Sequence, residues 1–177
     1  MAFQVAHSEI QQSNKLNIDE VLLDSTVLST KEGLQMTGIS PTPVGASRFL
    51  TADQEFSVLV SLWGDFAGSM YLNLSRAGAM HLGGAFLGED FSEVNDDLMD
   101  CVAELGNMIA GRFKENLRET RFGIQTISLP AVIVGANYNL YHTRGIVTAS
   151  VTFEIEDMPM FMMKDRFFSC SISLMQR

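Results

Sequence analysis

Three polar side chains in the predicted helix 97–113 have the types and the spacing that could perform chemistry. At about 100° per residue, Asp100, Glu104, Asn107 and Gly111 fall within an arc of roughly 60°, and the apolar residues occupy the other side of the helix. An amide can orient a water molecule and a carboxylate can pair with a basic side chain, but neither is a strong nucleophile. Gly111 has no side chain, so another protein surface could approach the backbone there. The pattern favours a face that is presented to a partner.

The alternative interpretation of this helix face is plain solvent exposure, because Glu and Asn are common on exposed helices. Two features favour a site instead. Asn is mildly unfavourable in the middle of a helix, since its amide competes for backbone hydrogen bonds. Gly106 and Gly111 each cost about 1 kcal/mol relative to alanine. A helix that gives up stability in this way is typical of a functional site.

Four positions carry a resemblance to a known family: Asp100, Glu104 after three residues, Asn107 after two more, and Pro130 further along the chain. This spacing resembles the signature of the CheC, CheX and FliY family of chemotaxis phosphatases, and the string ELGNMIAG, residues 104–111, is similar to the family's helix. The resemblance implies a phosphatase that removes the aspartyl phosphate of a CheY-like response regulator. It also implies that the regulator supplies Mg²⁺ and a lysine, and that this chain needs no cofactor of its own.

The resemblance also assigns roles to individual residues. Asn107 would enter the active site of the regulator and hold the attacking water in line with the phosphorus, while Glu104 would pair with the lysine of the regulator. Asp100 would lie at the rim of the contact, Gly111 would let the partner approach, and Pro130 would shape the neighbouring surface.

The fold that the resemblance implies is α+β, with an antiparallel or mixed β-sheet packed against long α-helices. One copy of the signature per chain is expected, because the first long helix has Leu23 three positions after Glu20, where an Asn would be needed. CheC-like members carry two copies and CheX-like members one, so the chain is most similar to the CheX type. CheX-like members pair edge strands across a homodimer, and we expect a homodimer here.

Length and charge limit the classes of function. The chain has 177 residues, of which 46% are hydrophobic and 19% charged, and this predicts one well-buried domain. We expect the domain to span residues 15–177, preceded by a flexible or partner-packed arm, residues 1–14. A net charge of −9 argues against a nucleic-acid partner, because the chain could not neutralise a run of phosphates. The partner is expected to be a protein or a small molecule.

The cysteines and histidines predict no metal site. Cys101 and Cys170 lack metal-ligand spacing and are expected to be buried, reduced thiols of a cytoplasmic protein. His7, His81 and His142 are scattered, without a carboxylate or cysteine at ligand spacing. No apolar run reaches the roughly 18 residues of a membrane-spanning helix, so we expect no membrane insertion.

Apolar periodicity predicts the order of helices and strands. Three helices are expected: residues 17–36 with Asn17 as N-cap, 76–87 with Ser75 as N-cap, and the helix of the signature with Ser92 as N-cap. Strands are expected at 45–50, in a hairpin within 53–74, at 124–129, 131–134 and 145–155, and in a last hairpin of 158–163 with 167–174. Pro130 indicates a sheet edge, a bulge or a strand start beside the signature helix. The four methionines in 158–163 are interpreted as core residues rather than as a binding groove.

Two other functions fit parts of the pattern. A non-catalytic module like the rotor switch protein FliM could share the fold and bind a response regulator or a flagellar switch component. Such a module would not need Glu104, Asn107 and Pro130 together. A small-molecule-binding signalling domain finds support in the apolar late strands. The complete signature therefore favours the phosphatase.

Overall fold

The structure consists of long helices and a large sheet, in the order that the sequence predicts for most of the chain. It is a computed structural model that describes residues 17–50, 52–136, 138 and 144–177. The helices are α2 (Glu20–Gly33), α3 (Arg76–Leu87) and α4 (Asp96–Arg118), with the 3-10 turns η1 (Gln35–Thr37) and η2 (Met160–Met162). The strands are β1 (Thr42–Ser47), β2 (Phe56–Gly64), β3 (Phe66–Leu74), β4 (Ile124–Ile127), β5 (Ala131–Val134), β6 (Val147–Glu154) and β7 (Phe167–Gln176). The expected arm, residues 1–14, lies outside the described residues.

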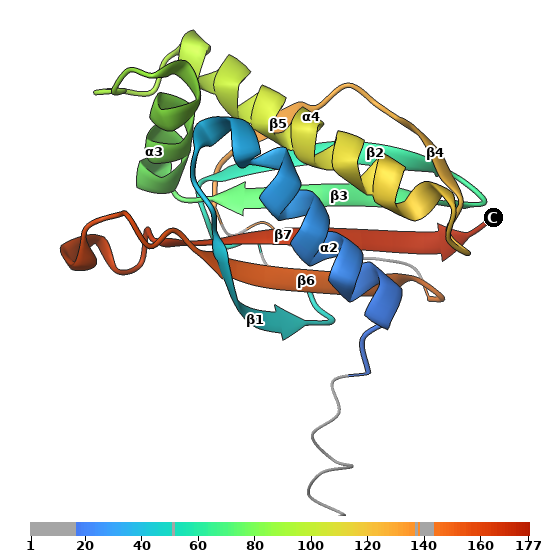
Figure 1. The fold of residues 1–177 in the computed structure, drawn as a ribbon. Coiled ribbons are helices and arrows are strands. Elements are labelled where there is room, and N and C mark those ends of the chain that lie inside the picture. Colours follow the sequence, from blue (N-terminus) through green and yellow to red (C-terminus); the bar gives the residue numbers. More distant parts are fainter. Residues whose placement is uncertain (1–16, 51, 137, 139–143) are drawn as a thin grey trace, which may run out of the picture.

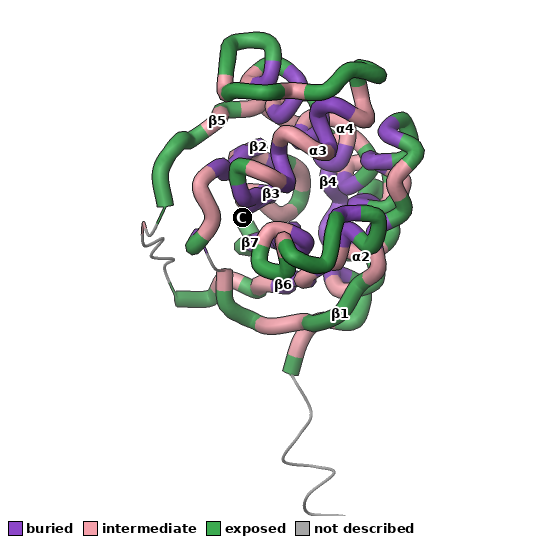
Figure 2. The backbone as a smooth tube through the Cα atoms, turned by 90° about the vertical axis from the view of Figure 1, so that its left-hand side faces the viewer, coloured by how far each residue is buried: buried purple, intermediate pink, exposed green. Residues whose placement is uncertain are grey.

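The strands form one sheet in the order β1-β6-β7-β3-β2-β4, and β5 also pairs with β2. Every described pair is antiparallel. The helices α2 and α4 run side by side across one face of the sheet, and α3 lies at the end where β6 connects to β7 (Figure 1). Seen along the sheet, both long helices lie on the same side of the strands (Figure 2). The α+β architecture expected from the sequence is therefore confirmed.

The starts of two helices differ from the expected ones. The side chain of Asp19, not Asn17, accepts a hydrogen bond from the backbone N–H of Leu22 and caps α2. Asn95, not Ser92, caps α4 by accepting from the N–H of Leu98. The capping prediction was right for α3, where Ser75 accepts from the N–H of Gly78. In both helices the N-cap is the Asn or Asp directly before the first helical residue, and not the polar residue further upstream that the sequence suggested.

The predicted last hairpin is wrong. Residues 158–163 form no strand but a connection that contains η2, and the hairpin partner of β7 is β6. The backbone N–H of Ile155 donates to the carbonyl of Arg166, which closes the β6–β7 hairpin before the methionines begin. Met158 lies in the core and Met162 packs against it, whereas Met160 and Met163 are exposed. The interpretation of all four methionines as core residues therefore fails for two of them.

Two glycines let the helices pack closely. A Cβ atom on Gly106 of α4 would overlap with the side chain of Val58 on β2, and one on Gly33 of α2 would lie 2.7 Å from Cα of Ile109 on α4. The buried face of α2 otherwise consists largely of Ser and Thr. The hydroxyl groups of Thr26 and Thr30 donate hydrogen bonds to backbone carbonyls of the same helix. Small side chains thus bring α2 against α4, and α4 against the sheet.

Gly106→Ala and Gly111→Ala provide a matched test of this packing on one helix. Gly106→Ala should lower the free energy of unfolding by about 1–3 kcal/mol, because the added methyl group would overlap with Val58. Gly111→Ala should raise it by up to about 1 kcal/mol, because alanine is the better helix former and, apart from the adjacent residues and backbone of its own helix, no atom lies within 4 Å of the position of its Cβ. Urea unfolding followed by circular dichroism measures both values. Equal effects of the two changes would contradict the close contact at Gly106.

Candidate active site on helix α4

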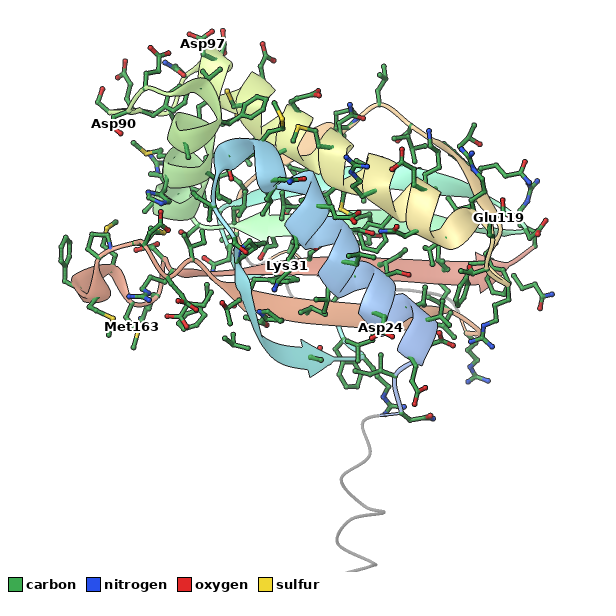
Figure 3. The ribbon with its side chains drawn as sticks, in the orientation of Figure 1. Asp24, Lys31, Asp90, Asp97, Glu119 and Met163 are labelled. Carbon is green, nitrogen blue, oxygen red and sulfur yellow. The ribbon has the colours of Figure 1, made fainter. Side chains whose placement is uncertain are left out.

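The outward face of α4 carries the four residues that the sequence singles out on this helix. Asp100 and Glu104 are exposed, and Asn107 and Gly111 are partly exposed. The side of α4 that faces the core is buried at Leu98, Val102, Leu105, Ile109 and Phe113. In Figure 3 the labelled Asp97 and Glu119 mark the two ends of the helix, and side chains project outward between them. The amide and carboxylate groups are therefore open to a partner.

A weak hydrogen bond joins the two candidate catalytic side chains. Nδ2 of Asn107 donates to Oε2 of Glu104 over 3.4 Å, at an exposed position. A bond of this length in contact with water contributes little free energy, so a competing donor can replace it. The bond keeps the amide and the carboxylate beside each other, but it is too weak to prevent either group from binding another partner. Both groups remain free to take new partners.

The rotation of α4 turns Asn107 toward one edge of the sheet. Gly106 lies against Val58 of β2, and Val58 pairs with Val132 of β5. Ile109 lies against α2 on the other flank of α4, at Gly33. With about 100° between successive residues, Asn107 points to the flank opposite the one that faces α2. The amide therefore lies on the side of α4 where β4 and β5 form the sheet edge.

Pro130 lies at a bulge on this edge. Ile127 of β4 pairs with Leu62 of β2, and Ala131 of β5 pairs with Leu59, so three residues of one chain segment oppose two of the other. The N–H of Ser128 donates to the carbonyl of Ser61, and the N–H of Ser61 donates to Oγ of Ser128. Proline has no N–H to donate, which suits a break between two edge segments. The sequence-based expectation of an edge or a bulge beside the signature helix agrees with this arrangement.

Two exposed apolar residues flank the candidate site and were not singled out from the sequence. Leu129 is 88% exposed at the bulge, and Met36 is 73% exposed in η1. Met36 lines a groove of about 280 Å³ between the end of α2 and α4, together with Met108 and Gly111. Leu129 was expected inside a strand, and Met36 at the end of a helix, so neither position suggested exposure. The signal that could have identified Leu129 is its place directly before Pro130 in a broken strand.

The cysteine chemistry near the site is inert. Burial, with the nearby carboxylates of Asp97 and Asp100, raises the pKa of the Cys101 thiol. Burial raises the pKa of Cys170 to about 12. Both thiols are therefore protonated at neutral pH and are poor nucleophiles. Within the described residues, no cluster of three or more His, Cys, Asp or Glu side chains could hold a metal ion.

No helix in the described part of the chain is both long enough and apolar enough to cross a membrane.

Comparison with known families decides the relationship. The family model of the chemotaxis phosphatase CheX matches residues 56–154, which is more than half of the chain. The chain belongs to the CheX family. The matched segment includes Asp100, Glu104, Asn107, Gly111 and Pro130. No protein with a curated description matches the sequence.

Solved structures share the CheX fold. The chain is 24% identical to the chemotaxis protein CheX from Desulfovibrio desulfuricans, with a TM-score of 0.70 over 86% of this chain and 98% of that one. For CheX from Vibrio vulnificus the identity is 20% and the TM-score 0.72, over 86% and 98% of the two chains. For the CheX–CheY–BeF3–Mg²⁺ complex from Borrelia burgdorferi the values are 22% and 0.67, over 92% and 100%. At these identities the likeness shows a common fold.

Removing the candidate catalytic side chains should leave the fold intact. Glu104→Ala and Asn107→Ala should each change the free energy of unfolding by no more than about 0.5 kcal/mol, because the two side chains are outside the core and share only a weak hydrogen bond. Leu105→Ala, between them on the buried side, should cost about 2–5 kcal/mol. Urea unfolding curves measure all three. A loss above about 2 kcal/mol in either polar variant would assign that residue to the structure rather than to a site.

Proposed function

We propose that this CheX-family chain hydrolyses the aspartyl phosphate of a CheY-like response regulator. The observation that carries the proposal is the pair Glu104 and Asn107, one turn apart on the open face of α4 in a chain of the chemotaxis phosphatase family. The B. burgdorferi complex, in which CheX is found with CheY, BeF3 and Mg²⁺, supports a CheY-like partner. It also supports a Mg²⁺ ion that arrives with the regulator.

The chemistry follows from what the regulator holds and what it lacks. By the family resemblance, the regulator supplies the reactive phosphoryl group, its Mg²⁺ and a lysine. Hydrolysis then needs mainly a water molecule in line with the bond that breaks. Asn107 can both donate to that water and accept from it, so its amide can fix the position of the water. Asn107 is therefore assigned the positioning of the attacking water.

Glu104 is assigned the docking of the regulator. Its carboxylate is exposed, and Asn107 provides only a long hydrogen bond. A lysine ammonium would be a stronger partner, because it brings a full opposite charge to the carboxylate, whereas the amide of Asn107 is neutral. When Glu104 takes the lysine, the amide of Asn107 is released for the water. Docking and water positioning are thereby coupled.

Asp100, Gly111 and Pro130 are assigned to the contact around this pair. Gly111 is the clearest case, because a Cβ atom there would meet nothing within 4 Å. The packing of the chain therefore gives no reason for glycine at 111, whereas it does at Gly106. A partner backbone that approaches α4 would give one. Asp100 on the same face and Pro130 at the bulge border the surface that this partner would cover.

Two further expectations stay predictions. Homodimer formation through a sheet edge is supported by β5, whose Ile133 and Val134 are exposed. A cytoplasmic location follows from the proposed regulator partner.

The competing function is a FliM-like module that binds a regulator without hydrolysis. It would keep the surface of α4 but show no acceleration of phosphate loss.

Asn107→Ala should lower the rate of regulator dephosphorylation by roughly two orders of magnitude or more, because the attacking water loses the group that positions it. Candidate CheY-like regulators from the same genome are phosphorylated, and phosphate release is measured with and without the protein. Asp24→Ala, an exposed change on α2, serves as the control and should keep the full rate. A normal rate with Asn107→Ala would overturn the catalytic role. Binding without acceleration by the unchanged protein would favour the FliM-like module.

Glu104→Ala should weaken binding as well as turnover. Removing the carboxylate leaves the lysine of the regulator unpaired at a desolvated contact, which costs about 2–5 kcal/mol. Titration calorimetry is performed with the regulator bound to BeF3 and Mg²⁺, using the unchanged protein, Glu104→Ala and Asn107→Ala. Glu104→Ala should lose most of the affinity, and Asn107→Ala should keep more of it. Equal affinities for the unchanged protein and Glu104→Ala would exclude docking and assign Glu104 to general-base chemistry, with activity that falls as pH drops.

A further inference from the structure

An apolar surface lies at the end of the molecule where β6 connects to β7. Phe161 is 88% exposed there, with Met160 at 66% and Met163 at 50%. In Figure 3 the labelled Met163 lies at this end, on the same side as Asp90, while Glu119 marks the opposite end of the molecule. Large apolar side chains in one exposed connection are unusual on a protein surface and indicate an interaction site.

A cavity of about 540 Å³ opens beside this connection. Its apolar lining comes from α3, from the segment before α4 and from the β6–β7 connection: Met80, Phe91, Met158 and Met162. We call this cavity the methionine groove. Methionine side chains are flexible and polarizable, so a surface made of them adapts to apolar partners of different shapes. The exposed Phe161 lies in η2 next to Met162 and extends the apolar surface beyond the groove.

The walls of the methionine groove are held in place by described contacts. Arg166 is buried and forms an ion pair with Glu154 over 2.7 Å, and it also donates to the sulfur of Met160. Across the groove, Nε2 of His81 on α3 lies 3.1 Å from Oδ2 of Asp157 in the connection. The connection is therefore attached both to the sheet and to α3. The groove exists before any partner binds.

The charges around the groove are mainly negative. Asp90 and Asp165 line it, and neither has an ion-pair partner among the described residues. Arg76 also lines it, but its guanidinium is paired with the carboxylate of Glu55. The pairing lowers the positive charge that Arg76 presents to a ligand. A partner that fills the groove would therefore gain by bringing positive charge to its rim.

We propose that the methionine groove binds an amphipathic helix of a partner protein, with apolar residues on one face and Lys or Arg on its flanks. Apolar side chains of the helix would fill the cavity, and its basic residues would meet Asp90 and Asp165. A second copy of this chain fits less well, because each copy carries a net charge of −9 and would bring negative charge to an acidic rim. None of the residues that line the groove belongs to α4, which carries Glu104 and Asn107. The groove is therefore a second surface, separate from the proposed phosphatase site.

The test uses a synthetic peptide of about 18 residues, five helical turns, made of Leu and Lys with the Leu on one helical face. Its control is a scrambled peptide of the same composition, with the same charge but no apolar face. The protein carries methyl-¹³C methionine, and the peptides are added to the full chain. The amphipathic peptide should shift the methyl signals of Met80, Met158 and Met162, while those of Met36 and Met108 stay in place. Signals that do not move, or that move equally with the scrambled peptide, would overturn the proposal.

Variants check the same binding by fluorescence anisotropy of the labelled peptide. Phe161→Asp should weaken binding roughly tenfold, and it should not disturb folding because Phe161 is exposed. Met36→Asp adds the same charge at an exposed methionine outside the groove and should change affinity less than about twofold. Equal losses in the two variants would show that Phe161 has no specific part in binding and would overturn the proposal. Groove signals that change with protein concentration in the absence of peptide would do the same, in favour of a second copy of the chain.

Discussion

The contact between Gly106 and Val58 determines how α4 lies on the sheet. Because the glycine has no side chain, the backbone of α4 comes close to β2 at this point, and the helix cannot rotate without overlap. Every other position on α4 follows from that rotation. Leu105 and Ile109 enter the core, Glu104 faces solvent, and Asn107 turns toward the sheet edge. The close packing of one residue thus orients the whole outward face.

The sequence predicted those helices and strands whose ends are determined by residues close to them in the chain. Helix α3 was predicted at residues 76–87, as observed, because both of its caps, Ser75 and Gly88, are directly adjacent to it. The hairpin of β2 and β3 was predicted because its turn follows directly after Gly64. The last hairpin was not, because residues 158–163 resemble a strand in composition, while the pairing of Ile155 with Arg166 closes the hairpin earlier. No pattern of neighbouring residues in the sequence indicates that Ile155 pairs with Arg166.

The candidate site also has parts that the sequence predicted and parts that only the fold revealed. The outward face of α4 could be predicted, because helical periodicity alone places Asp100, Glu104 and Asn107 together. Proline chemistry predicted an edge or a bulge at Pro130, but it did not predict that β4 and β5 share the edge of β2 on either side of it, because that pairing joins residues far apart in the sequence. The chemical roles of these residues came from the family resemblance and not from periodicity. The exposure of Leu129 and Phe161 became visible only with the fold.

The close packing of α4 against the sheet affects how quickly the proposed site could act on a regulator. Glu104 and Asn107 belong to a helix that tertiary packing already orders, so the entropy needed to fix their backbone is lost during folding rather than at each encounter. On the proposed mechanism, the resting protein is ready to act whenever a phosphorylated regulator arrives. The lifetime of the signal would then be set by how often the two proteins meet. A cell could shorten its response simply by making more of this protein.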